Sequence, residues 1–124
     1  MIVVDTSVWI EFLRGNSSIY PNLKLLLEKN EILAFEPVFG ELLQGAKNKR
    51  ERDIISNYWI NLPKFTSDGS FFLGGLHSGQ GKWLSKGVGL IDCSILMYAR
   101  ERGCQLWTFD KKLKSILHYD EMYP

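Results

Sequence analysis

The sequence has few cysteines, no long apolar run and almost no net charge. Its two cysteines, Cys93 and Cys104, have no CxxC spacing and no histidine placed for zinc, so we expect buried free thiols rather than a metal or redox motif. No apolar run approaches the roughly 20 residues that cross a membrane. The N-terminal segment has no basic start, and Asp5 interrupts it, which argues against a signal peptide. We therefore expect a cytoplasmic protein without a membrane partner.

The chain alternates predicted strands and helices over 124 residues, a length typical of one domain. We expect strands at residues 2–4, 31–35, 62–65 and 105–108, and an edge strand at 118–123. Helices are expected at residues 6–13 (capped by Thr6 or Ser7), 21–29, 37–46, 50–60, 90–102 and 111–117. Four glycines predict a broken or kinked helix over residues 70–86. Strands separated by helices imply an α/β fold with three α/β/α layers and a mostly parallel sheet, in a single domain over residues 1–124.

Four carboxylates lie near the predicted carboxyl ends of the strands. Asp5 directly follows the apolar strand at 2–4, and Asp110 closely follows the strand at 105–108. Asp92 opens a helix, and Glu41 lies one turn into another. Parallel α/β sheets bind ligands outside the carboxyl ends of their strands, so we expect the four acids at one rim. Each aspartate has an alternative interpretation as a helix-capping or helix-start residue, and Glu41 as an ordinary exposed glutamate.

Four clustered carboxylates repel one another unless a cation lies among them. Magnesium prefers oxygen ligands and promotes in-line displacement at a phosphodiester. Setting these four acids aside leaves fifteen basic against ten acidic side chains, hence a charge of +5 on the remaining surface. This charge suits a nucleic-acid substrate. No protein nucleophile is evident, because His77 and His118 share no motif with an acid or a serine.

Four segments of the chain resemble, in order, the four motifs of bacterial PIN domains. They are VVDTSVWIEFLRG, FGELLQGA, GLIDCSILMYARERG and LWTFDKKL. At this length the chain resembles the VapC toxins of type II toxin–antitoxin pairs. That resemblance implies a Mg²⁺- or Mn²⁺-dependent endoribonuclease acting on structured RNA such as tRNA or rRNA. It also implies a homodimer, and a VapB-type antitoxin whose tail occupies the acidic site.

The resemblance also implies roles for individual residues. Asp5 and Asp92 would be the main metal ligands, Asp110 would complete the metal site, and Glu41 would orient water or metal. Supporting hydroxyl groups would come from Thr6, Ser7 and Thr108.

The last motif departs from the family pattern. It often continues with an acid and a phenylalanine, whereas Lys111, Lys112 and Leu113 follow here and add positive charge at the rim. Further candidates for RNA contact are basic residues in two segments, one of them beside Trp83. These candidates are Lys47, Lys49, Arg50, Lys82 and Lys86. The first three also suit an ordinary solvated helix start.

Other functions place acids at the same edge of a sheet. A haloacid-dehalogenase-type phosphatase needs a second aspartate where Ser7 stands. A receiver-like Mg²⁺-binding signalling module needs an acid pair where Asp5 stands alone. A PIN-domain nuclease of RNA processing stays an open alternative to a toxin. The RNA target, the number of metal ions, the antitoxin and the role of the glycines at 74–81 are also open.

Overall fold

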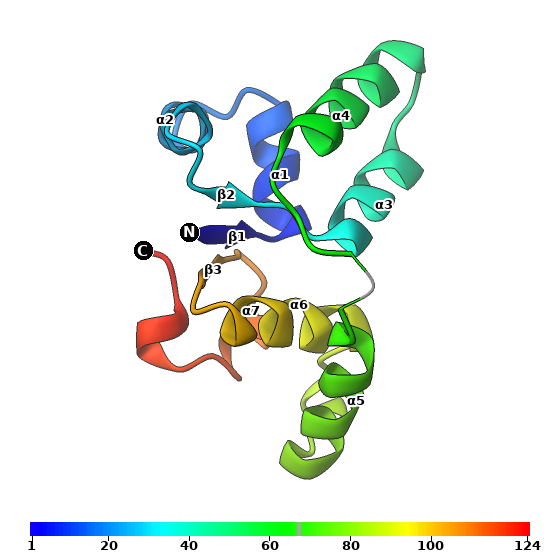
Figure 1. The fold of residues 1–124 in the computed structure, drawn as a ribbon, viewed down its shortest axis with the longest axis vertical. Helices are drawn as coiled ribbons and strands as arrows, with labels where there is room; N and C mark the ends of the chain where they lie inside the picture. Colours follow the sequence, from blue (N-terminus) through cyan, green and yellow to red (C-terminus); the bar gives the residue numbers. More distant parts are fainter. Residues whose placement is uncertain (67) are drawn as a thin grey trace.

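The computed structural model describes residues 1–66 and 68–124 and contains a parallel sheet with helices around it. The strands are β1 (Ile2–Val4), β2 (Ile32–Leu33) and β3 (Gln105–Trp107), in the order β2-β1-β3. Residue Ile2 pairs with Ile32 on one side and Gln105 on the other. Figure 1 shows α1 to α4 gathered toward the β2 edge and α5 to α7 toward the β3 edge. The predicted α/β/α fold with a parallel sheet is confirmed.

The predicted helices form with small shifts at their ends. They are α1 (Thr6–Leu13), α2 (Tyr20–Glu28), α3 (Glu36–Gly45), α4 (Lys49–Asn61), α6 (Leu90–Glu101) and a short α7 (Lys111–Lys114). The cap of α1 was predicted wrongly: the N-cap residue is Asp5, and its side chain makes no capping hydrogen bond. In the ranges that the structure describes, no helix is both long enough and apolar enough to cross a membrane.

The core lies around β1 and α6, which explains why β1 is continuously apolar and α6 mostly so. Val3 and Val4 are almost fully buried, and α6 buries every residue from Cys93 to Ala99. A strand covered on both faces needs apolar side chains at every position, as β1 has. Cys93 and Cys104 are buried free thiols, as predicted.

Two of the predicted strands are not strands. Residues 62–65 contribute one isolated bridge, between Ala34 and Lys64, and the backbone N–H of Phe65 donates to the Tyr98 hydroxyl at 2.9 Å rather than to a strand. Residues 118–123 contain the 3₁₀ helix η2 (Tyr119–Glu121) and one isolated bridge. In residues 118–123 the N–H groups of Glu121 and Met122 donate to the nearby carbonyls of His118 and Tyr119, so these groups are satisfied within the turn and not along the sheet.

The segment predicted as a broken helix over residues 70–86 is broken, but only after its last helical glycine, where Lys82 has a φ of 55°. It forms α5 (Ser70–Gly81), followed by the 3₁₀ helix η1 (Leu84–Lys86). Packing explains why the glycines do not break α5 itself: a Cβ on Gly74 would lie 2.7 Å from the Ser94 hydroxyl and 2.9 Å from its backbone nitrogen. Gly74 therefore lets α5 approach α6 closely, and this contact offsets the low helix propensity of glycine.

Candidate active site

Asp5 lies at the carboxyl end of β1 with its side chain held by two hydroxyl groups. The residue is only 6% exposed. Its Oδ2 accepts hydrogen bonds from Thr108 Oγ1 at 2.7 Å and from Ser7 Oγ at 2.9 Å. In residues 1–66 and 68–124, no hydrogen bond reaches its other oxygen, Oδ1. One oxygen is thus fixed by the protein, and the second is available to a ligand.

The same hydroxyl groups connect the ends of β1 and β3. Thr108 Oγ1 accepts the backbone N–H of Asp110 at 3.0 Å, and Ser7 Oγ accepts the N–H of Phe109 at 3.1 Å. The Ser7 interaction joins residues 102 positions apart in the chain, and the Thr108 interaction fixes the turn after β3. They hold the backbone of Asp110 close to Asp5.

Asp110 has a structural role as well as a place at the rim. Its Oδ1 accepts the backbone N–H groups of Lys112 at 2.8 Å and Leu113 at 3.0 Å, so it caps α7. Such capping is worth about 1 kcal/mol. Asp110 is therefore a helix-capping residue, as one of its two interpretations from the sequence predicted. Capping uses only Oδ1 and leaves Oδ2 for other contacts.

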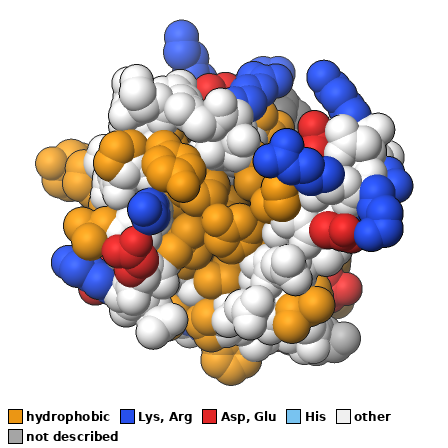
Figure 2. Space-filling model, turned by 90° about the horizontal axis from the view of Figure 1, so that it is seen from above, with side chains coloured by type: hydrophobic (Ala, Val, Ile, Leu, Met, Phe, Trp, Pro, Cys, Tyr) orange, Lys and Arg blue, Asp and Glu red, His pale blue; other side chains and the backbone are white. Residues whose placement is uncertain are grey.

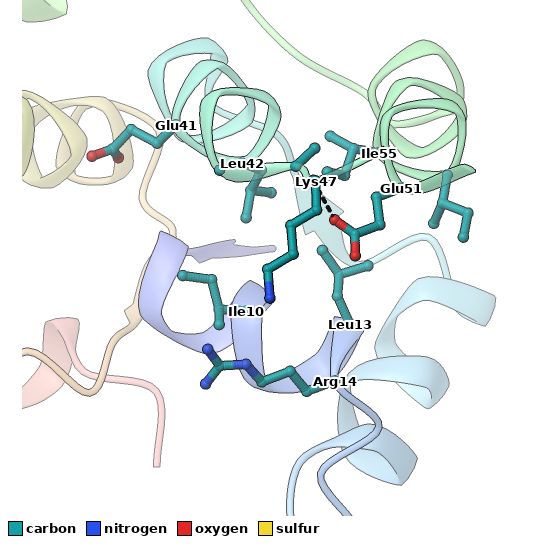
Figure 3. Close-up of a pocket in the computed structure, with 11 residues that line it drawn as sticks. Ile10, Leu13, Arg14, Glu41, Leu42, Lys47, Glu51 and Ile55 are labelled. Atoms are coloured by element: carbon teal, nitrogen blue, oxygen red, sulfur yellow. Dashed lines mark hydrogen bonds between the residues drawn. The ribbon is translucent and has the colours of Figure 1, made fainter. Parts of the chain in front are cut away.

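Glu41 is joined to the start of α1. Thr6 Oγ1 donates a hydrogen bond of 2.8 Å to Glu41 Oε1. Figure 3 shows the Glu41 carboxylate directed away from Leu42 and the other apolar side chains nearby. Thr6 thus orients the glutamate from α3 as Thr108 orients Asp5.

The pKa of Asp92 responds to the charges of the other three acids. It lies in the first turn of α6, half-buried, and in the described part of the chain its carboxylate accepts no hydrogen bond. Burial raises its pKa from 3.8 to about 6, and the nearby charges of Asp5, Asp110 and Glu41 add to the increase. Because the charges of the other three acids act on Asp92, the fold brings the four predicted acids near one another.

This donor set suits a hard divalent cation. It consists of carboxylate oxygens, some of them without a hydrogen-bond partner, beside one another in a partly buried place. No three His, Cys, Asp or Glu side chains in the described ranges already enclose a single ion position. Magnesium does not need such a cage, because it usually keeps several waters and is held by one or two carboxylates together with substrate phosphates. The residues present fit Mg²⁺ or Mn²⁺ held in that manner.

The predicted RNA-contact residues lie in two separate places. Lys82 and Lys86 are exposed at the end of α5 and in η1, just before the helix of Asp92. Lys47 and Arg50 are exposed around the start of α4, where Lys49 forms an ion pair of 2.8 Å with Asp53. Only the first pair leads directly into an acid-bearing helix.

Sequence reasoning missed an apolar groove beside Glu41. Its volume is about 310 Å³, and it lies between α1, α3 and α4, with Arg14, Lys47 and Glu51 at its rim (Figure 3). Figure 2, seen from above, shows apolar side chains at the centre of this end of the molecule and charged ones around them. The apolar lining consists of Ile10, Leu13, Leu42, Ala46, Ile54 and Ile55. The sequence of α1 did carry a hint of this groove, because Ile10 and Leu13 are apolar residues outside the helical stripe of Val8, Trp9 and Phe12. In the structure each of the two is 37% exposed.

Comparison with known proteins identifies the family. The PIN-domain profile matches residues 2–117. Ribonuclease VapC32 of Mycobacterium tuberculosis, in strains CDC 1551 and H37Rv, is 35% identical over 119 residues, covering 93% of this chain and 89% of the relative. A chain of the VapBC2 complex from Rickettsia felis, solved bound to a promoter DNA fragment, shares the fold with a TM-score of 0.71 at 24% identity, over 98% of this chain and 96% of that one. The chain therefore belongs to the PIN-domain family and is a VapC-like nuclease.

Proposed function

We propose that this protein is a Mg²⁺- or Mn²⁺-dependent endoribonuclease that cuts structured RNA of the tRNA or rRNA class as the toxin of a toxin–antitoxin pair. The observation that carries the proposal is the Asp92 carboxylate, half-buried beside three other acids and without a hydrogen-bond partner in the described residues. The similarity to a named ribonuclease supports RNA as the substrate. A single PIN domain over residues 1–124, located in the cytoplasm, belongs to the same proposal.

Each site residue has a different proposed role in phosphodiester cleavage. Asp5 and Asp92 would hold the cation, and the free oxygen of Asp110 would complete its protein ligands. A bound Mg²⁺ lowers the pKa of water and neutralises charge on the phosphodiester. Ser7 and Thr108 keep Asp5 in position through Oδ2, which leaves Oδ1 directed to the ligand. Glu41, oriented by Thr6, is placed to accept a proton from an attacking water.

The groove beside Glu41 fits a VapB-type antitoxin segment. Its apolar lining would take the apolar side of such a segment, and its rim offers charges of both signs in Arg14, Lys47 and Glu51. Glu41 itself lines the groove, so a chain bound there reaches the acidic site. A basic side chain from the antitoxin could then occupy the place of the cation, which would block cleavage.

The outer face of α5 fits a second copy of the chain. Phe72 is 75% exposed, and Leu76 follows it one helical turn later. Beside them lies a hollow of about 640 Å³ lined by Gly75, Gly79 and apolar residues that include Leu84 and Leu90. An exposed aromatic side chain next to an apolar hollow suits a twofold interface, where each copy fills the hollow of the other. The homodimer proposal rests on this complementarity.

The experiment that tests the enzyme proposal is incubation of purified, antitoxin-free protein with total RNA, with Mg²⁺ or with chelator. We expect cleavage only with the metal. Asp5→Asn and Asp92→Asn should each lower the rate by about 100-fold or more, the scale of losing one group that stabilises transition-state charge. Asp120→Asn is the matched control, because Asp120 is exposed in η2 and its carboxylate forms no ion pair in the described residues.

Growth and folding measurements complete the test. Expression of the wild-type chain alone should arrest growth, and the two site variants should relieve the arrest while they keep the circular dichroism spectrum of the folded protein. RNA cleavage without growth arrest would favour an RNA-processing nuclease over a toxin. Cleavage that persists in chelator, or in both variants, would refute the metal mechanism.

A further inference from the structure

The side chain of Lys112 lies across the loop that carries Gly87. An ideal Cβ built on Gly87 would lie 3.2 Å from Lys112 Cδ and 3.3 Å from both Cε and Nζ. Gly87 also has a φ of +80°, which disfavours any other residue. The lysine therefore occupies space that exists because residue 87 is a glycine.

The same residue is attached to the acidic site through its backbone. The Lys112 N–H donates to Asp110 Oδ1 at 2.8 Å. The loop that its side chain crosses leads within a few residues into α6, where Asp92 lies in the first turn. The Lys112 ammonium is thus held between the two segments that carry Asp92 and Asp110.

Among the described residues, the Lys112 ammonium forms no ion pair with a carboxylate. In residues 1–66 and 68–124 no carboxylate oxygen lies within 4.0 Å of Lys112 Nζ, and the same holds for Lys86. Arg100 and Arg102, by contrast, form ion pairs with Glu121 and Asp68. An unpaired ammonium group keeps its full attraction for an incoming polyanion.

We propose that Lys112, together with Lys86, the residue before Gly87, binds a backbone phosphate of the RNA next to the one that is cut. This inference rests on the proposed ribonuclease function and names positioning residues for it. An RNA strand is repelled by four clustered carboxylates, and a neighbouring cation that holds its backbone offsets this repulsion. Phosphate contacts of this kind set the register of the strand and carry no sequence information.

The test compares Lys112→Gln with Lys114→Gln in binding of a short fluorescein-labelled hairpin RNA, measured by anisotropy in chelator over a range of salt concentrations. Lys114 is an exposed lysine of the same short helix and is the matched control. We expect Lys112→Gln to weaken binding about tenfold and to lower the slope of log affinity against log salt by about 1. Lys112→Arg, which keeps the charge, should restore both.

Cleavage kinetics give a second readout. With Mg²⁺, Lys112→Gln should raise KM by a similar factor and leave kcat within about twofold, because a contact to a neighbouring phosphate that does not react is made equally in the ground and transition states. A purely structural role would lower the melting temperature without changing the salt slope.

Unchanged RNA affinity and KM in Lys112→Gln would overturn the inference. It would also be overturned if the variant lost affinity for polyglutamate and not for RNA, because the surface would then serve an acidic protein. A wild-type protein that binds the hairpin but never cuts RNA would contradict the proposed ribonuclease instead, so the two failures are distinguishable.

Discussion

Asp92 is ionised at neutral pH at a cost to the folded state. Its pKa in the folded protein is about 6, above the ordinary 3.8, because of burial and the charges of Asp5, Asp110 and Glu41. Between these two values the folded state binds more protons than the unfolded state, so stability must fall as pH rises through this window. Above about pH 6 the full penalty is present.

At the scale of this residue, Asp92→Asn should stabilise the metal-free protein at pH 7. We expect a gain of about 1 kcal/mol, smaller than the full pKa shift would imply because solvent screens a half-buried group. The stability difference between variant and wild type should shrink as pH falls toward 4. Urea unfolding at several pH values, in chelator, measures it.

A measurement with added Mg²⁺ is the control for the predicted stability of Asp92→Asn. The metal should raise the melting temperature of the wild type at pH 7 and have little effect on Asp92→Asn, because the variant has lost a ligand and much of the repulsion. Equal metal stabilisation of both proteins, or a stability difference that does not depend on pH, would contradict the prediction.

At the scale of elements, α5 shows why four glycines do not break a helix before Lys82. Four glycines lower helix propensity, and propensity is a local quantity. The helix is stabilised by a tertiary contact with α6 at Gly74, where a methyl group would collide with the backbone of Ser94. Gly79, in the same helix, has no atom within 4 Å of an added Cβ.

This difference predicts opposite effects of the same substitution in one helix. Gly74→Ala should destabilise the fold by about 1–3 kcal/mol, because α5 must move away from α6. Gly79→Ala should stabilise the subunit by about 0.5–1 kcal/mol, since it restricts the unfolded chain and adds helix propensity without a clash inside the subunit. Urea denaturation of both variants at one protein concentration is the measurement. A destabilised Gly79→Ala together with a neutral Gly74→Ala would show that the close approach of α5 to α6 is not needed.

At the scale of the whole molecule, two apolar surfaces are proposed to receive two different partners. Phe72 on α5 belongs to the proposed dimer face, and Ile54 on α4 belongs to the groove beside Glu41. Phe72→Arg should therefore give monomers in sedimentation velocity, and Ile54→Arg should stay dimeric. The charged side chain is unfavourable only where a partner would bury it.

Each variant is the control for the other in a growth assay. Ile54→Arg should still arrest growth but should escape neutralisation by the co-expressed antitoxin, because its groove no longer accepts an apolar segment. Phe72→Arg should still be neutralised when it is active. If both variants remain dimeric, or if both are neutralised as well as the wild type, the assignment of the two surfaces fails.

The residues at strand ends and helix starts were predictable from the sequence alone. Asp5, Asp92 and Asp110 follow or open elements whose apolar patterns are local, and the topology of a parallel sheet brings such positions to one edge. The four acids therefore lie together as expected, as Asp92's perturbed pKa shows. Their roles in catalysis and metal binding stay predictions.

The hydroxyl groups and the groove needed the tertiary structure. Thr108 meets Asp5 across 103 positions of the chain, and which oxygen it holds depends on backbone geometry that no local pattern encodes. The strand expected at 62–65 failed for a related reason, since the backbone N–H of Phe65 donates to the hydroxyl of Tyr98, which lies 33 positions away in the chain.

Sequence by itself determined the helical and strand periods, the parallel topology and the order of the acids, because these depend on neighbours a few residues apart. Tertiary structure alone decided that α5 runs unbroken against α6, that Lys112 crosses Gly87, and that Ile10 and Leu13 line a groove. Those features depend on the space left between elements distant in the chain, which is set only when the core has packed.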